Sequence, residues 1–251
     1  MTVQITVLFF TLGLIFGSFF NVVGLRLPAK LSFANDRSMC PQCKHILSWY
    51  ELVPVLSYLK QLGRCRHCHT AISLMYPVIE VLTGLLFAYS YLRHGLGLEL
   101  VIAICFMSML VIILVADISY MLIPDRVLLF FLPLFIILRV IQPLHPWWSS
   151  IVGGILAFVL IAVIILVSRG GMGAGDMKLF GVLGIVLGVK QVMLAFILSC
   201  MIGAIVSLFL LLLKRMNRRQ PFPFGPYIVV AAIISYFDGY SLINWYMQLF
   251  S

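Results

Sequence analysis

An all-α, multi-pass membrane protein is the fold class that this sequence predicts, and three observations support that prediction. Hydrophobic residues make up 63% of the 251 residues and charged residues only 10%, a composition that cannot cover a water-soluble surface. Apolar runs long enough for a helix to cross about 30 Å of hydrocarbon recur along the whole chain. The basic residues gather in the connections between those runs. Lipid is therefore the expected solvent for most of the chain.

Eight apolar runs are candidate membrane-spanning helices, at 3–25, 73–92, 99–117, 126–142, 150–168, 177–189, 191–213 and 226–248. The sixth run is short for a full crossing, which needs about 20 residues, and Asp238 and Gly239 interrupt the last one. We therefore expect seven or eight spans. No basic residue precedes the first run and no small-residue cleavage site follows it, so it is expected to be a retained span rather than a signal peptide.

The basic residues are distributed unevenly between the two sides of the membrane. A formal charge of +9 would suggest a nucleic-acid partner in a soluble protein. With eight spans, however, 14 of the 17 Lys and Arg residues fall on one side, and short cytoplasmic loops are the ones that accumulate such residues. We therefore expect the N-terminus outside, the connections 26–72, 117–125 and 169–176 in the cytoplasm, and no nucleic acid as a partner.

One connection is polar enough to form a separate module. It divides the chain into a first transmembrane helix at 1–25, a cytoplasmic insert at 26–72 and a transmembrane domain at 73–251. The insert is too short to build a large apolar core, so we expect it to need a covalent or metal cross-link.

Four cysteines in the insert provide that cross-link. Cys40 and Cys43 form one C-x2-C pair, and Cys65 and Cys68 form a second pair after 21 intervening residues. Two such pairs supply four thiolates to a tetrahedral zinc ion, and two disulfides are the alternative. We favour zinc because the cytoplasm is reducing. A site closed by four cysteines leaves no position for substrate, so the zinc is expected to be structural.

Three aspartates border long apolar runs on the side predicted to be cytoplasmic: Asp117, Asp125 and Asp176. An ionisable group at membrane depth is costly and by default suggests a function. Two carboxyl groups held within a few ångströms share a proton, so that one activates water and the other protonates the substrate. Asp125 and Asp176 are also placed as helix N-caps would be, and for Asp125 we prefer that interpretation.

Five segments together resemble the type IV prepilin peptidases, a family of bifunctional leader peptidases and N-methyltransferases. The resemblance is nearly full length, because the segments also occur in the family's order around the double C-x2-C insert. They are 17–28 (GSFFNVVGLRLP), 48–58 (SWYELVPVLSY), 72–80 (ISLMYPVIE), 117–125 (DISYMLIPD) and 173–178 (GAGDMK).

The resemblance implies an aspartic protease in which Asp117 and Asp176 activate the hydrolytic water and Asp125 is supporting. It also implies prepilin or pseudopilin precursors as substrates, each with a short basic leader before an apolar helix. These are cut at the cytoplasmic face of the bacterial inner membrane and then methylated with S-adenosylmethionine, whose binding residues stay unassigned. One departure is Met75, where the family commonly has Arg; it bears on methyl transfer rather than on cleavage.

Two other functions fit the physical features without the resemblance. In a transporter or channel, the buried aspartates would relay protons or bind a cation. In a membrane scaffold, the cysteine insert would recruit partners and the aspartates would only cap helices. The first explains the cysteine insert poorly, and replacing the aspartates by asparagine in a cleavage assay separates the second from an enzyme.

Overall fold

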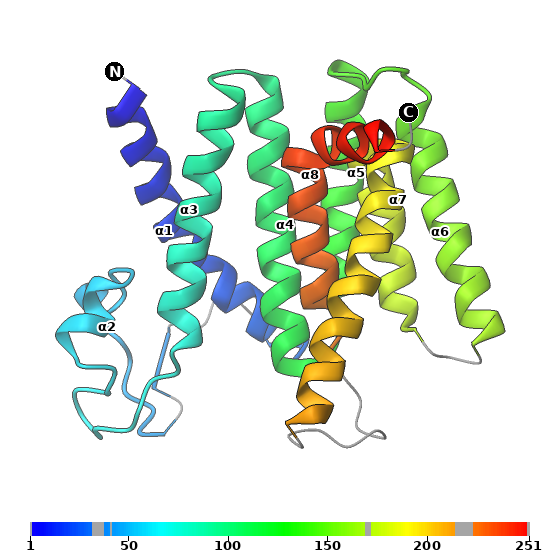
Figure 1. Ribbon diagram of the computed structural model, residues 1–251. Coiled ribbons are helices and arrows are strands. Elements are labelled where there is room, and N and C mark those ends of the chain that lie inside the picture. Colours follow the sequence, from blue (N-terminus) through cyan, green and yellow to red (C-terminus); the bar gives the residue numbers. More distant parts are fainter. Residues whose placement is uncertain (1, 32–37, 41, 169–171, 214–222, 250–251) are drawn as a thin grey trace. The chain divides into compact units, whose positions relative to one another are not determined.

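The structure is a computed structural model that describes residues 2–31, 38–40, 42–168, 172–213 and 223–249 (Figure 1). The regular elements of these ranges are all helical: eight α-helices, α1 to α8, and one short 3-10 helix. Six of the helices are long and apolar enough to cross a membrane. The prediction of an all-α, multi-pass membrane protein is confirmed.

The chain divides into two compact units, Met1–Val115 and Ala116–Ser251. The first unit contains α1 (Thr2–Arg26), the 3-10 helix (Trp49–Glu51), α2 (Leu56–Lys60), α3 (Met75–His94) and most of α4 (Leu98–Tyr120). In this unit α1 packs against α3. A Cβ atom on Gly13 would lie 2.6 Å from the Cα atom of Gly84. A small residue at this crossing therefore lets the two backbones meet, the usual way in which helices associate in lipid.

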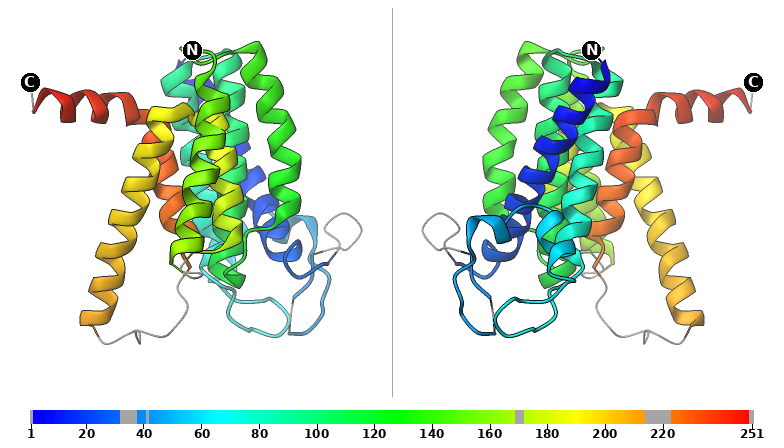
Figure 2. Two further views of the ribbon diagram at one scale, coloured as in Figure 1. Left: turned by 90° about the vertical axis from the view of Figure 1, so that its right-hand side faces the viewer. Right: turned by 90° about the vertical axis from the view of Figure 1, so that its left-hand side faces the viewer.

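The second unit contains the end of α4 followed by α5 (Asp125–Ile141), α6 (Ser149–Val167), α7 (Ala174–Leu212) and α8 (Gly225–Gln248). Helix α7 is central, because α6, α8 and α5 all pack against it. Figure 2 shows that the C-terminal part of α8 turns away from the rest of that helix, in the region where Asp238 and Gly239 interrupt the apolar run.

A kink divides α7 into two arms. Its 39 residues would extend about 58 Å if straight, but Gly188 has φ 76° and ψ 176°, a conformation that is strained for residues with a side chain. Two side chains bond backbone groups at the kink: Arg139 donates to the Val186 carbonyl oxygen at 2.8 and 3.1 Å, and the Val189 N–H donates to Ser149 Oγ at 3.1 Å. Backbone groups in lipid need such partners.

The eight predicted helical ranges are all helical, with one difference in how they connect. We expected 177–189 and 191–213 as separate helices, whereas they are the two arms of the kinked α7. A glycine in a φ-positive conformation turns the helix here without ending it. Of the connections expected on the cytoplasmic side, residues 32–37, 169–171 and 214–222 lie outside the described residues.

Candidate functional site

Asp117 and Asp176 line the same cavity in the second unit. The cavity has a volume of about 930 Å³ and is formed by the end of α4, the segment before α5, the start of α7, later turns of α7 and the segment before α8. Asp125 and Lys178 line it too. The fold thus brings together two acidic groups that 58 residues separate in the sequence.

Asp176 is positioned by the helix that it helps to begin. Helix α7 starts at Ala174 with Gly173 as its N-cap, and Asp176 is the third helical residue. Its Oδ2 atom accepts a hydrogen bond from the Gly173 N–H at 3.1 Å, and the residue is 8% exposed. This bond satisfies a backbone donor at the helix start. The expectation that Asp176 is a helix N-cap was therefore wrong: Gly173 is the N-cap, and the Asp176 side chain bonds its backbone from the first turn of the helix.

Asp117 lies in the last turn of α4, where the helix dipole disfavours a negative charge. The start of a second helix offsets this unfavourable dipole. Oδ2 of Asp117 accepts a hydrogen bond of 2.9 Å from the N–H of Gly225, the first residue of α8. Asp117 is 5% exposed. Each aspartate thus has one oxygen bonded to a backbone donor at the start of a helix, where negative charge is stabilised.

Gly225 is a site residue that was not predicted from the sequence. A Cβ atom at this position would lie 2.6 Å from Oδ2 of Asp117 and 2.9 Å from its Cβ atom, so a side chain at 225 would push the carboxyl group away. Pro226 directly follows Gly225 near the start of α8. That Gly-Pro pair predicts a helix start, but it does not predict which carboxyl group the helix start holds.

Asp125 pairs with Lys178 at the edge of the cavity. The Lys178 Nζ atom lies 2.9 and 2.8 Å from the two carboxylate oxygens, and both side chains are about half exposed. We expected Asp125 to be a helix N-cap, and this was wrong: α5 begins at Asp125 itself, and its N-cap is Pro124. Asp125 still lies in the first turn of a helix, which favours an acidic residue.

The four cysteines of the insert form a cluster that can hold a metal ion. Their sulfur atoms all lie within 4.8 Å of one another, with 3.7 Å between Cys40 and Cys68 and 4.0 Å between Cys43 and Cys65. Four thiolates bound to zinc at about 2.3 Å would be about 3.8 Å apart at the corners of a tetrahedron. The donor set and its spacing therefore fit zinc.

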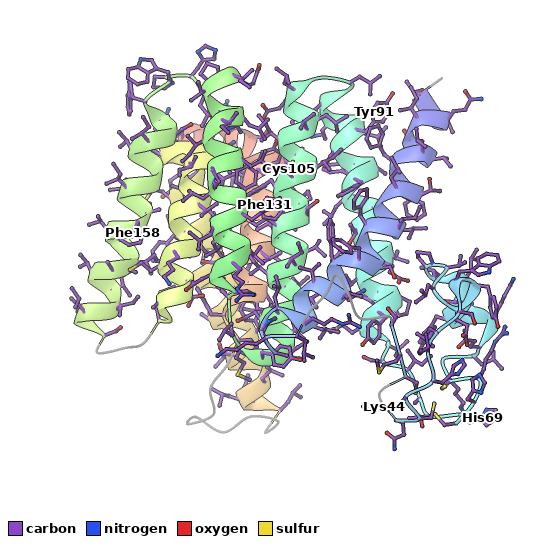
Figure 3. All side chains as sticks on the ribbon, turned by 180° about the vertical axis from the view of Figure 1, so that it is seen from behind. Lys44, His69, Tyr91, Cys105, Phe131 and Phe158 are labelled. Atoms are coloured by element: carbon purple, nitrogen blue, oxygen red, sulfur yellow. The ribbon has the colours of Figure 1, made fainter. Side chains whose placement is uncertain are left out.

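The two cysteine pairs share one local backbone structure. In the first, the Cys40 N–H donates to the His45 carbonyl and Lys44 has φ 58°. In the second, the Cys65 N–H donates to the Thr70 carbonyl and His69 has φ 54°. Figure 3 shows Lys44 and His69 at the same end of the insert.

The environment of Cys68 favours the thiolate that a metal requires. Hydrogen bonds to the Thr70 hydroxyl and to the Thr70 backbone lower the pKa of the Cys68 thiol to about 6. The neighbouring His45 and His67 rings lie against each other, with their centroids 3.6 Å apart and their planes tilted by 35°. Cys105 and Cys200 lie in α4 and α7, outside this cluster.

Three buried polar residues of the first unit make structural hydrogen bonds. Glu51 accepts the Ser48 N–H at 2.9 Å within the insert. Glu80 of α3 accepts the Val55 N–H at 2.8 Å and so ties the insert to the helix. Asn21 of α1 donates to the Tyr76 carbonyl at 3.2 Å, while its Oδ1 atom has no hydrogen-bond partner within the described part of the chain.

Comparisons with known proteins identify the family to which the chain is similar. Residues 104–208 match the type IV leader peptidase family, and residues 11–94 match the bacterial peptidase A24 N-terminal domain. A Bacillus subtilis protein named prepilin leader peptidase/N-methyltransferase is 45% identical over 96% of this chain and 97% of its own length. Proteins of the same name from Vibrio cholerae and Aeromonas salmonicida are 34% and 32% identical, over 92% and 96% of this chain and 96% and 93% of their own lengths. No solved structure matches significantly.

Proposed function

We infer that this chain, which belongs to the type IV leader peptidase family, removes the leader from prepilin or pseudopilin precursors, with Asp117 and Asp176 as its catalytic pair. The observation that carries this proposal is the shared cavity, in which both carboxyl groups are buried and each is held by one backbone N–H. Preorganised groups of this kind are what catalysis of peptide hydrolysis requires.

The geometry supports acid–base catalysis by the two carboxyl groups. Both Oδ2 atoms accept backbone hydrogen bonds, which leaves the Oδ1 atoms to contact water and the scissile peptide. One carboxylate removes a proton from water as it attacks the carbonyl carbon, while the protonated partner donates to the carbonyl oxygen. Collapse of the tetrahedral intermediate then breaks the C–N bond: the proton taken from water passes to the leaving amine, and a hydroxyl proton of the intermediate returns to the partner carboxylate.

Orientation in the membrane is the next part of the proposal. The excess of Lys and Arg on one side supports an N-terminus outside the cell and a catalytic cavity that faces the cytoplasm, in the bacterial inner membrane. In this orientation the leader of a precursor meets the aspartates on the cytoplasmic side of the membrane.

Thiol labelling of intact cells tests the orientation. In a variant that lacks all six cysteines, single cysteines at Leu96 and Gln142 are expected to react with an impermeant reagent, because the proposed orientation places these two connections outside. A cysteine at Ser168, which follows α6 directly, should react only after the cells are opened. The reverse pattern would invert the orientation.

We also propose that the insert binds structural zinc through its four cysteines and that the chain methylates the new N-terminus. S-adenosylmethionine, the donor we propose, supplies an electrophilic methyl group when it is bound. We assign no residue to that donor. The two buried glutamates of the first unit, Glu51 and Glu80, already accept hydrogen bonds from backbone N–H groups. Asn21 Oδ1 is a buried acceptor with no donor among the described residues.

Removing two zinc ligands tests the role of the insert. A Cys40→Ser/Cys43→Ser variant is expected to fall from about one zinc per chain to none, because two hydroxyl groups do not replace two thiolates and metal binding is coupled to folding. Methylation of a pre-cleaved pilin should fall more than leader cleavage. Metal analysis and product masses measure both, and Cys105→Ser, outside both the cluster and the lining of the cavity, is the control.

The opposite order of effects would contradict this division of roles. A zinc-free variant that methylates a pre-cleaved pilin normally and yet fails to cut the precursor would assign the insert to the protease.

Mass analysis of both reaction products tests the proposed function itself. Purified chain in lipid is incubated with a prepilin precursor and S-adenosylmethionine. We expect the free leader and a mature chain heavier by one methyl group. An intact precursor would refute the proposal, and cleavage without the added methyl group would refute its second half.

A further inference from the structure

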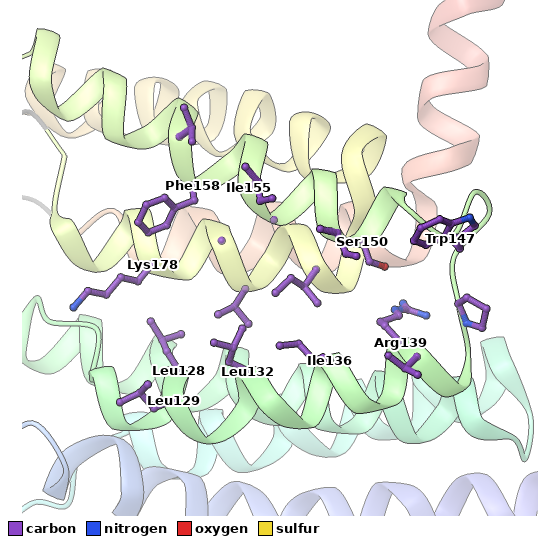
Figure 4. Close-up of a pocket in the computed structure, with 18 of the residues that line it drawn as sticks. Leu128, Leu129, Leu132, Ile136, Arg139, Trp147, Ser150, Ile155, Phe158 and Lys178 are labelled. Carbon is purple, nitrogen blue, oxygen red and sulfur yellow. The ribbon is translucent and has the colours of Figure 1, made fainter.

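A long apolar groove opens along α5 in the second unit. It lies between α5 on one side and α6 with the first arm of α7 on the other, and has a volume of about 980 Å³ (Figure 4). Its walls are mainly aliphatic and aromatic side chains, among them Leu132 and Ile136 of α5, Ile155 and Phe158 of α6, and Ile185 of α7. The proposed reaction as described above leaves this groove without a role.

The groove adjoins the cavity that contains the aspartates. Asp125 and Lys178, the ion pair described above, line both spaces. Figure 4 shows Lys178 at one end of the groove and Arg139 with Trp147 at the other. A chain segment that lies in the groove therefore has one end at the ion pair that borders the cavity of Asp117 and Asp176.

The length of the groove favours a helix as its occupant. The 15 residues from Asp125 to Arg139 of α5 correspond to about 22 Å at 1.5 Å per residue. One lipid leaflet contributes only about 15 Å of hydrocarbon, so an acyl chain from one side would not fill the groove. A transmembrane helix is long enough to cover the whole groove and replaces lipid contacts by packing against the groove walls.

We propose that this groove binds the apolar helix that follows the cleavage site of the precursor and so holds the scissile bond at the aspartates. This inference rests on the proposed function, because it takes the prepilin-like precursor as the occupant. The binding free energy of the helix would be used to position a remote peptide bond. The groove is thus a specificity surface: it selects substrates whose cleavage site adjoins a membrane-spanning apolar segment.

A pair of substitutions on α6 tests the groove. Ile155 lines the groove and is 61% exposed, whereas Val163 of the same helix is 49% exposed and lies outside it. Two substrates are compared: the full precursor and a short leader peptide that lacks the apolar helix. Ile155→Trp fills part of the groove, so we expect it to reduce kcat/KM for the precursor relative to kcat/KM for the peptide by about tenfold. Val163→Trp should leave that ratio unchanged.

Photocrosslinking keeps the test decisive if a tryptophan variant fails to fold or the short peptide reacts too slowly. A photoreactive amino acid replaces Ile155 or Val163 in the inactive Asp176→Asn chain, which is mixed with precursor in lipid. We expect crosslinks from position 155 to the apolar segment of the precursor and none from position 163. Equal crosslinking at both positions, or crosslinks to lipid alone, would refute the proposal that the groove binds the apolar helix of the precursor.

Failure of the groove and failure of the proposed function give different results. If the wild-type chain cuts the precursor and the Ile155→Trp ratio equals that of the wild type, the groove proposal is wrong and the peptidase stands. If the wild-type chain cuts neither substrate, the proposed function is wrong.

Discussion

Replacing Gly225 by alanine is expected to lower leader cleavage about 100-fold, the loss that a displacement of about 1 Å at a catalytic group produces. The added Cβ atom would lie 2.6 Å from Oδ2 of Asp117, so the carboxyl group must move. Alanine keeps the backbone N–H that now donates to that oxygen at 2.9 Å. The expected loss therefore comes from displacement of Asp117 and not from a missing donor.

Cleavage rates in lipid, with thermal unfolding measured in parallel, check this prediction. Gly97→Ala is the control, because a Cβ atom at that glycine meets nothing within 4 Å. Both variants should unfold at temperatures close to that of the wild type, and only Gly225→Ala should lose activity. A folded Gly225→Ala chain with wild-type cleavage would show that the position of Asp117 does not limit the reaction.

The helices and the residues of both sites follow from local features of the sequence. Apolar runs set the helices because a helix must be apolar for about 20 residues to cross the membrane. The spacing of the cysteines predicts a metal cluster once it is combined with the reducing compartment that is expected for the insert. Asp117 and Asp176 are recognisable because an acidic residue next to an apolar run is costly.

The features that were not predicted from the sequence depend on contacts between distant residues. The bond from Gly225 to Asp117 joins residues 108 positions apart, and Arg139 bonds a carbonyl 47 positions away. No local pattern encodes such pairs. The groove beside α5 likewise depends on how α5, α6 and α7 pack. The wrong cap at Asp125 is a different kind of error, since helix ends are uncertain by one or two residues.

Replacing Asp117 or Asp176, the proposed catalytic pair, by asparagine is expected to abolish leader cleavage. Asparagine has nearly the shape of aspartate, but it neither ionises nor donates an acidic proton. A pair that shares one proton requires both carboxyl groups, so Asp117→Asn and Asp176→Asn should each reduce the rate by about 10⁴-fold or more.

Asp125→Asn is the matched control for these two variants. It changes an aspartate that lines the same cavity but that pairs with Lys178 and is about half exposed. An exposed ion pair contributes about 1 kcal/mol or less to stability. This variant should therefore fold and keep measurable cleavage activity.

The rate of leader release by these three purified variants, in the same lipid and with the same precursor, tests the catalytic pair most directly. The account predicts no leader from Asp117→Asn or Asp176→Asn and measurable leader from Asp125→Asn, with all three chains folded. Leader released at the wild-type rate by either of the first two variants would contradict the account. In that case the buried aspartates would cap helices or bind ions, as a scaffold or a transporter would use them.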